Sequence, residues 1–484
     1  MRRLLARHGA AAALCALLVS GCSSDSNSNR NFQPAPDPAT PARLHDQRSF
    51  TPVLPSEETL AALELEGATL YSGLHEGEHG HASYLIQVPD NWNGVLVMYA
   101  HGYRGEEEAL TVQPPVIYQQ LIDHGYAWAA SSYSANYYDV RAGIEDTNAL
   151  ALAFEALTRD VQGNSPGSPS KYYIIGHSMG GHIAGAAVEA ETLATANNVV
   201  EYAGAVPMCG VMGDTELFDY FAAYNLAAQE LAGIDIEVTA ENYVEEVLPR
   251  ITDALWIGYG NAPGGSTGVP TEAGMHLLNI LERLSGGARP TYVLSSQVRA
   301  WHDLLLGFGV PNGNVSGILA SNVVDTTDIQ YRWSDGAITA DERAFNQAVE
   351  RYSPTPGANA PRPDGLRWIP QVNGEFSVPV VTLHTLGDLF VPFEMQRIYA
   401  RRAEENGSDQ WLVQRAIRAV EHCDFTADEE WEAFTDMVAW ELNGQRPDGD
   451  EVLDPSIVAA SDYGCAFTRE NRFPDVAALA CPAP

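Results

Sequence analysis

One stretch, residues 171–181, constrains the fold of this chain more than any other. It reads K-Y-Y-I-I-G-H-S-M-G-G, and residues 183–194, rich in alanine and glutamate, follow it. A short apolar run, a turn with flanking glycines and a helix-like segment predict a strand, a sharp turn and a helix. Gly176 and Gly180 lie two residues either side of Ser178, where a side chain would collide with the strand and the helix. The turn would hold the Ser178 hydroxyl at a helix N-terminus, where backbone N–H groups favour negative charge.

In this setting the G-x-S-x-G motif resembles the nucleophile elbow of the α/β-hydrolase family. The resemblance implies a mostly parallel, twisted sheet flanked by helices, with Ser178 as the nucleophile. From residue 60 onward, strand-like runs recur with helix-like segments between them, as such a sheet requires. We expect residues 68–74 and 81–88 to form an antiparallel pair at its start. The other expected strands are 94–100, 127–132, 172–175, 201–207, 378–384 and 411–420.

The acid and the base of a catalytic triad should follow the serine in the order Ser, Asp or Glu, His. Residues 385–392 (T-L-G-D-L-F-V-P) come after a late strand and resemble the acid loop of the family, so Asp388 is the expected acid. Asp214 and Asp219, after the preceding strand, are the alternatives. His422 lies just past the last expected strand, where the family carries its base.

The loop after the third strand is the expected first half of an oxyanion hole. His101-Gly102 occupies that place. By the resemblance, the backbone N–H groups of Tyr103 and Met179 would be the two donors to the oxygen that becomes negative. A plain strand-end turn with a satisfied histidine is the alternative.

We expect no metal and no cofactor. His75, His79 and His81 form an H-x-x-x-H-x-H cluster that could bind a metal, but nothing nearby completes a site. No nucleotide-binding motif is visible. His177 and His182 lie too close to Ser178 along the chain to act as its base.

A large insertion separates the two parts of the expected fold. The core would comprise residues 56–208 and 378–444, interrupted by a helical cap at residues 209–377 after the sixth strand, and followed by a tail at 445–484. The cap is dense in apolar and aromatic residues, most of which we expect to form its own core. Its expected helices are 217–231, 241–257, 271–284, 292–307 and 340–351.

The N-terminus reads as a targeting signal. Three arginines precede an apolar run at residues 10–19 that is too short to span a bilayer, and the sequence L-V-S-G-C ends at Cys22. This ending resembles the lipobox of bacterial lipoproteins, which implies cleavage after residue 21 and a lipid on Cys22. An ordinary signal peptide is the alternative. Residues 22–55 are expected to form a disordered tether, with the protein held at the bacterial cell envelope, by resemblance at the outer membrane.

The charge balance excludes one class of partner. The chain has 63 acidic against 27 basic residues, a formal net charge of −36, and Lys171 is its single lysine. Such a surface repels nucleic acid. The acids are spread along the chain, which predicts a solvated surface suited to high salt. Oligomeric state is not predicted.

Four cysteines remain after the signal and the lipid site: Cys209, Cys423, Cys465 and Cys481. In an oxidising compartment they allow two disulfides in three pairings. In the fold that this chain resembles, the ends of the relevant strands meet at one edge of the sheet, which favours Cys209–Cys423 and leaves Cys465–Cys481. Free thiols, or a Cys423–Cys465 bridge, are the alternatives.

These features together predict a serine hydrolase that cleaves a carboxylic ester through an acyl-enzyme. A peptidase or amidase of the prolyl-peptidase-like branch is the second reading, because that branch shares the order of the triad and the fold. A non-catalytic lipoprotein that uses the scaffold for binding is the third.

Overall fold

The computed structural model of the chain describes residues 48–159, 162–236, 243–308, 323–476 and 479–481. The predicted signal, Cys22 and most of the predicted tether lie outside these residues. No helix within them is long and apolar enough to cross a membrane.

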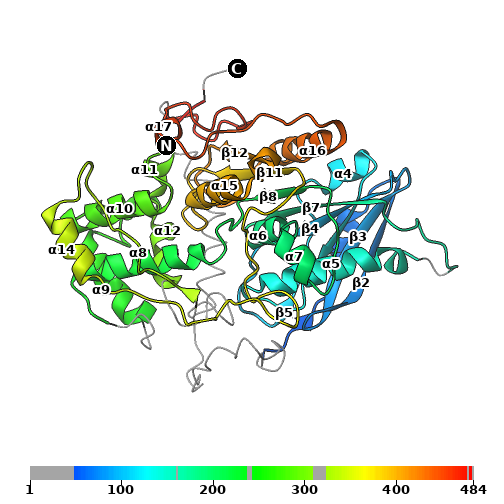
Figure 1. The fold of residues 1–484 in the computed structure, drawn as a ribbon, viewed down its shortest axis with the longest axis horizontal. Helices are drawn as coiled ribbons and strands as arrows, with labels where there is room; N and C mark the ends of the chain where they lie inside the picture. The colour runs from blue at the N-terminus through cyan, green and yellow to red at the C-terminus, as the bar shows by residue number, and fades with distance from the viewer. Residues whose placement is uncertain (1–47, 160–161, 237–242, 309–322, 477–478, 482–484) are drawn as a thin grey trace.

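An eight-stranded sheet runs through the right-hand part of the molecule (Figure 1). Its strand order is β12-β11-β8-β7-β4-β6-β3-β2. The pairs β2–β3 and β3–β6 are antiparallel, and every other neighbouring pair in this sheet is parallel. The predicted α/β-hydrolase fold is confirmed. The strands are β2 (Ala68–Gly77), β3 (Gly80–Pro89), β4 (Val95–Ala100), β6 (Ala127–Ser131), β7 (Lys171–His177), β8 (Ala205–Met208), β11 (Val380–Thr385) and β12 (Leu412–Ile417).

Helices cover both faces of this sheet because alternate strand residues point to opposite faces and both sets are apolar. Met98 and Ile174 belong to the core shared with α5 (Val140–Leu157) and α6 (Met179–Ala186). Val97 and Ile175, one residue out of phase, belong to the core shared with α4 (Tyr118–Asp123) and α16 (Ala427–Asn443). Both faces of the central strands are therefore buried.

The chain between β8 and β11, the insertion (residues 209–377), carries most of its helices in the left-hand lobe of Figure 1. Three of its predicted helices are found with small shifts at their ends: α8 (Glu216–Ala232), α10 (Glu272–Leu284) and α14 (Ala340–Ala348). In the segment predicted at 241–257, a π-helical turn at Tyr243–Val247 precedes α9 (Leu248–Leu255). The α8 helix packs against its neighbours α9 and α10.

Two predicted helices are each divided in the structure. The segment at 292–307 forms α11 (Tyr292–Ser295) and α12 (Arg299–Phe308), and between them the Ser296 carbonyl accepts the ring N–H of His302 at 2.8 Å. The segment after the elbow forms α6 and then α7 (Ala190–Thr195), with a break before Glu189.

The predicted disordered tether (residues 22–55) includes residues at its C-terminal end that are ordered in the structure. The short strand β1 (Thr51–Pro52) pairs in parallel with β5 (Ala109–Leu110), and Arg48 donates to Asp139 at 2.8 Å. Their partners lie more than fifty residues away along the chain, so composition alone could not reveal this contact.

The C-terminal tail packs on the end of β12. It contains α17 (Pro455–Val458) and is closed by a disulfide between Cys465 and Cys481. The buried Arg418 guanidinium donates to the carbonyls of Tyr463 at 2.8 Å and Leu479 at 2.9 Å.

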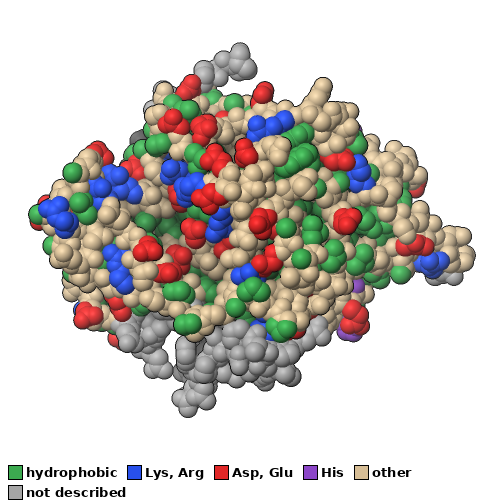
Figure 2. All heavy atoms as spheres, viewed as in Figure 1, with side chains coloured by type: hydrophobic (Ala, Val, Ile, Leu, Met, Phe, Trp, Pro, Cys, Tyr) green, Lys and Arg blue, Asp and Glu red, His purple; other side chains and the backbone are tan. Residues whose placement is uncertain are grey.

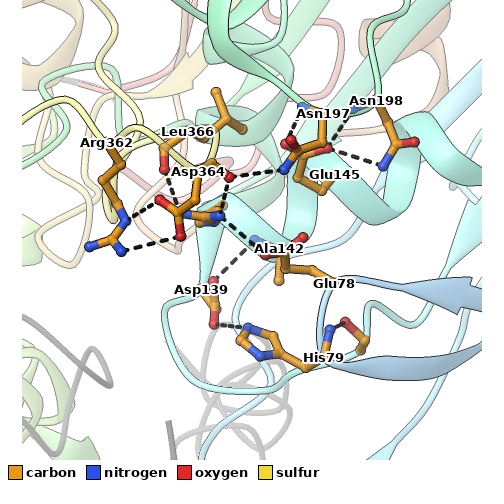
Figure 3. Close-up of polar contacts among 12 residues, drawn as sticks. Glu78, His79, Asp139, Ala142, Glu145, Asn197, Asn198, Arg362, Asp364 and Leu366 are labelled. Atoms are coloured by element: carbon orange, nitrogen blue, oxygen red, sulfur yellow. Dashed lines mark hydrogen bonds and ion pairs between the residues drawn. The ribbon is translucent and has the colours of Figure 1, made fainter. Parts of the chain in front are cut away.

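A polar network ties the returning end of the insertion to the core (Figure 3). Arg141 of α5 donates to the carbonyls of Leu366 at 2.7 Å and Asp364 at 3.1 Å, and it pairs with Glu78 at 3.2 Å. These contacts join the β2–β3 turn, α5 and the chain that leads back to β11. On the outer surface, acidic side chains are scattered over the face seen in Figure 2 with arginines between them.

Candidate active site

Ser178 lies at a strained turn between β7 and α6. Its φ of 59° and ψ of −121° place a residue with a side chain in the positive-φ region, which is uncommon outside functional sites. A Cβ on Gly176 would overlap the Gly180 carbonyl, and a Cβ on Gly180 would overlap the Ala100 carbonyl. Both glycines of the motif are therefore required by contact, as the sequence predicted.

The structure brings Ser178, His422 and Asp388 together from three separate strand ends. His422 Nε2 lies 2.8 Å from Ser178 Oγ, and His422 Nδ1 lies 2.5 Å from Asp388 Oδ2. In the tautomer with its proton on Nδ1, the imidazole donates to the carboxylate and accepts from the hydroxyl. This arrangement can remove the serine proton while the carboxylate steadies the imidazole.

The Asp388 side chain is fully buried and held by its own loop. Its Oδ1 accepts the N–H groups of Phe390 at 2.9 Å and Val391 at 3.0 Å, which leaves Oδ2 for the imidazole. The Phe390 ring meets the His422 ring edge to face, 5.4 Å between centroids. The carboxylate and the imidazole are thus each oriented by a second contact.

The two alternative acids have other partners. Asp214 Oδ2 accepts from Arg402 at 2.7 Å and from the Val372 N–H at 3.1 Å. Asp219 accepts the N–H of Asp325 at 2.6 Å, and burial raises its pKa to about 8. Both carboxylates hold segments of the insertion in place.

The two proposed oxyanion donors flank the serine. Met179 is the first residue of α6, and the first N–H groups of a helix have no partner within it. A Cβ on Gly102 would lie 3.1 Å from the Ser178 Cβ, so the backbone before Tyr103 passes directly over the serine. Among the described residues, no hydrogen bond occupies the Tyr103 N–H. That group and the Met179 N–H are the donors that an oxyanion could use.

His101 supports this loop from within the core. Its ring stacks on Tyr133 at 4.0 Å between centroids, and the Tyr133 hydroxyl donates to the His101 carbonyl at 3.0 Å. Burial lowers the pKa of His101 to about 3, so the imidazole is neutral. The side chain therefore supports the loop through packing.

The loop that carries His422 is held on both sides. The structure joins Cys423 to Cys209, with 5.4 Å between their Cα atoms. The Thr385 hydroxyl donates to the Glu421 carbonyl at 2.9 Å. The base is therefore anchored to the ends of β8 and β11.

A small apolar pocket of about 20 Å³ opens beside Ser178. None of the described residues that line it is charged. Three of them belong to α8, so the insertion forms part of the wall. The lining residues are Tyr103, Tyr138, Ser178, Val211, Leu217, Phe218, Phe221, Phe390 and Val391.

Sequence patterns did not identify Tyr138 or Val211 as pocket residues. Val211 follows the carboxyl end of β8, and ligands bind at the carboxyl ends of the strands in open α/β sheets. Its position could therefore have indicated a pocket residue. Nothing in the local pattern marks Tyr138, which precedes α5 and bonds His182 through its hydroxyl at 2.8 Å.

The histidines considered for metal binding are engaged with other groups. His75 bonds the Ser131 hydroxyl at 2.8 Å, and His79 bonds Asp139 at 3.0 Å. Within the described part of the chain, one group of three close ligand atoms exists, formed by His422 and the two cysteines beside it. Those sulfurs are joined to each other, so neither is available as a thiolate.

No family model matches the chain. It is 22% identical over 435 residues to an o-phthalyl amidase from Xanthobacter agilis, covering 79% of this chain and 90% of that protein. Among solved structures it is similar to feruloyl esterase B from Aspergillus oryzae (14% identity, TM-score 0.42), covering 81% of this chain and 90% of that one. It is also similar to an acylaminoacyl peptidase from Pyrococcus horikoshii (10% identity, TM-score 0.38), covering 82% of this chain but 46% of that one. The fold is established by the strand order of the chain itself.

Proposed function

We propose that this α/β-hydrolase-fold protein is a serine hydrolase that cleaves a carboxylic ester with an uncharged acyl group. The observation that carries the proposal is the placement of His422 between the Ser178 hydroxyl and the Asp388 carboxylate, at 2.8 and 2.5 Å. The strained elbow and the two backbone donors beside the serine support it.

In the proposed mechanism, His422 accepts the Ser178 proton while the serine oxygen attacks the carbonyl carbon. The carbonyl oxygen becomes negative and is stabilised by the N–H groups of Tyr103 and Met179. Asp388 stabilises the imidazolium, which then protonates the leaving alcohol. Water activated by the same imidazole releases the acid from the acyl-enzyme.

The chemistry of the pocket supports an uncharged group beside the serine. Its described walls are aromatic and aliphatic, and burying a charge there without a partner would be costly. A peptidase that recognises a charged chain terminus needs an oppositely charged binder for it, and none of the described lining residues is charged.

An amide substrate is the second candidate. The similar protein from Xanthobacter agilis is named an amidase, and the same triad can cleave amides by the same steps.

We further propose that the chain is attached to the bacterial envelope through a lipid on Cys22.

A fluorophosphonate probe and a substrate panel test these proposals. We expect the probe to label Ser178, and p-nitrophenyl esters to be hydrolysed faster than the matched p-nitroanilides. Faster anilide hydrolysis would favour the amidase. If the folded protein is not labelled by the probe and hydrolyses none of these substrates, the non-catalytic binder is indicated.

A further inference from the structure

We propose that two residues of the insertion, Arg289 and Tyr220, position the loop that carries Asp388. This inference rests on the proposed function, because it assigns the two side chains a role in the working of the triad. They are positioning residues, since neither touches Ser178, His422 or the space where a substrate would lie.

Arg289 binds the acid loop on the N-terminal side of Asp388. Its Nε donates to the Leu386 carbonyl at 2.5 Å, while its other nitrogens donate to Gly287 O at 2.8 Å and Ser285 Oγ at 3.1 Å. The side chain is buried, and its guanidinium lies over the Tyr292 ring, 5.2 Å from the ring centroid. Among the residues that the structure describes, no carboxylate lies within ion-pair distance of it. Burying a cation without an ion pair costs free energy, so the presence of Arg289 at this position needs a structural reason.

Tyr220 binds the same loop on the C-terminal side of Asp388. Its hydroxyl, on α8, donates to the Leu389 carbonyl at 2.8 Å. Leu386 and Leu389 lie on either side of Asp388 in the sequence. The insertion therefore donates hydrogen bonds to one backbone carbonyl before Asp388 and to one after it.

Close packing between the same segments supports this assignment. A Cβ on Gly387 would overlap Ser295 Oγ of α11 and come within 2.6 Å of the Val420 Cα. A Cβ on Gly286 would lie 2.9 Å from the Glu394 nitrogen, just after the acid loop. Ser285 also accepts the Glu394 N–H through its carbonyl, at 3.2 Å. Arg289 and Ser295 therefore contact the acid loop itself, while Ser285 and Gly286 contact the chain just after it.

The contacts act on the triad in two ways. The Oδ1 atom of Asp388 is oriented by the N–H groups of Phe390 and Val391, so any shift of this backbone turns the carboxylate away from His422. The Arg289 cation also interacts electrostatically with the Asp388 carboxylate. Burial lowers the pKa of Arg289, and the guanidinium remains a cation at neutral pH.

Several other ionisable groups face this pair and belong to the same electrostatic environment. They are His422 and His384 beside Asp388, and Tyr220, Tyr292 and Glu282 beside Arg289. Only Tyr220 is altered by a substitution below, and burial raises the pKa of Tyr220 well above its ordinary value, so Tyr220→Phe removes no charge. A change in pH dependence therefore reports on Arg289 itself.

Steady-state kinetics of Arg289→Met, Arg289→Lys and Tyr220→Phe test the proposal. We expect Arg289→Met to lower kcat about tenfold to a hundredfold with little change in KM, since the loss is one of orientation. Removing a cation makes its neighbours easier to protonate, so the acidic midpoint of the kcat/KM profile should move to higher pH. Arg289→Lys keeps the charge and should restore the midpoint. Tyr220→Phe should lower kcat without moving the acidic midpoint of the kcat/KM profile.

Arg351→Met is the matched control. Arg351 also lies in the insertion and donates to backbone carbonyls, those of Thr326 at 2.9 Å and Ile329 at 2.6 Å, neither of which belongs to the acid loop. We expect it to lower the thermal midpoint while leaving the pH profile unchanged.

The outcomes separate this inference from the proposed function. If fluorophosphonate does not label the wild-type protein, the proposed function fails. If the wild type is labelled and active, and folded Arg289→Met keeps its kcat and pH midpoint, the positioning role is overturned. If Arg289→Met does not fold, Tyr220→Phe decides: an unchanged kcat overturns the role, and a lowered kcat at constant KM supports it.

Discussion

Cys209, directly after β8, is bonded to Cys423, the residue that follows His422, with 5.4 Å between their Cα atoms. The bridge spans 214 residues and encloses the whole insertion and the acid strand. Both cysteines have positive φ, 44° and 56°, a backbone conformation that residues with side chains seldom adopt. The proposed base is therefore held by a covalent link to the strand end nearest the insertion.

Removing this bridge should impair catalysis as well as stability. With Cys209→Ala and Cys423→Ala combined, we expect kcat to fall at least about tenfold, because the His422 loop loses its anchor. On the chain-entropy model so long a loop is worth more than about 4 kcal/mol, although measured disulfides typically contribute 2–4 kcal/mol. Thermal unfolding and steady-state kinetics measure the two effects separately.

The second disulfide supplies the control. Cys465 and Cys481 are 16 residues apart in the tail, so replacing both by alanine should lower the thermal midpoint and leave kcat near the wild-type value. If the tail pair and the Cys209–Cys423 pair change kcat equally, the bridge beside His422 has no special part in holding the base.

The triad itself makes a second prediction. Ser178→Ala should abolish ester hydrolysis and probe labelling while leaving the fold intact. Asp388→Asn should lower kcat by about 10⁴, because it leaves the imidazole in the wrong tautomer. Asp214→Asn is the comparison, since that carboxylate pairs with Arg402 instead of His422. A larger loss in Asp214→Asn than in Asp388→Asn would reverse the assignment of the acid.

The sequence predicted those features of the site that depend on residues close together in the chain. The elbow around Ser178 could be predicted because its two glycines are required by contacts within one turn. Asp388 and His422 could be placed because each lies within five residues of a strand end: Asp388 follows β11, which ends at Thr385, and His422 follows β12, which ends at Ile417. Both strands were predicted from the sequence.

The remaining features depend on contacts between distant segments. The Tyr220 hydroxyl meets a carbonyl 169 residues away, and Arg289 one that is 97 residues away. Neither residue stands out in its own helix or loop. The pairing of Thr51 and Pro52 with β5 was missed for the same reason, because their partners lie 58 residues away along the chain.

The α8 wall makes a third prediction, on acyl selectivity. The Phe221 ring stacks on Phe390 at 5.7 Å and helps to leave a cavity of only about 20 Å³. Phe221→Ala should therefore raise kcat/KM for p-nitrophenyl butyrate relative to acetate by about thirtyfold or more, since butyrate adds two methylenes and each gains about 1–3 kcal/mol in an apolar pocket. Phe345→Ala removes a buried ring elsewhere in the insertion and should lower stability alone. An unchanged butyrate to acetate ratio in Phe221→Ala would show that acyl groups bind elsewhere.

The proposed anchor makes a fourth prediction. Cys22→Ser should remove palmitate labelling and release the protein from the membrane fraction or leave it unprocessed. Since Cys22 lies outside the described residues, cell fractionation with radiolabelled palmitate is the measurement. Palmitate labelling that persists in the variant would show that Cys22 is not the modified residue.

The last prediction concerns stability and pH. Glu189 is buried between α6 and α7, and its carboxyl oxygens accept the N–H groups of Gly374 at 2.9 Å and Glu375 at 2.7 Å. Burial raises the pKa of Glu189 from 4.5 to about 8. The folded state thus binds this proton more tightly than the unfolded chain does. The resulting stabilisation is complete below about pH 4.5 and is lost as the pH rises through 8.

Glu189→Gln tests this effect, because the amide is uncharged at every pH. Its NH2 group cannot accept the second backbone N–H, so the variant loses one hydrogen bond at both pH values. We therefore expect the stability of the variant relative to wild type, measured by urea unfolding, to be higher at pH 8.5 than at pH 4.5. Glu191→Gln is the matched control: it removes an ion pair with Arg367 at 2.5 Å and should lower stability without abolishing the pH dependence. If the difference between wild type and Glu189→Gln is the same at both pH values, then Glu189 does not release a proton across this range in the folded protein.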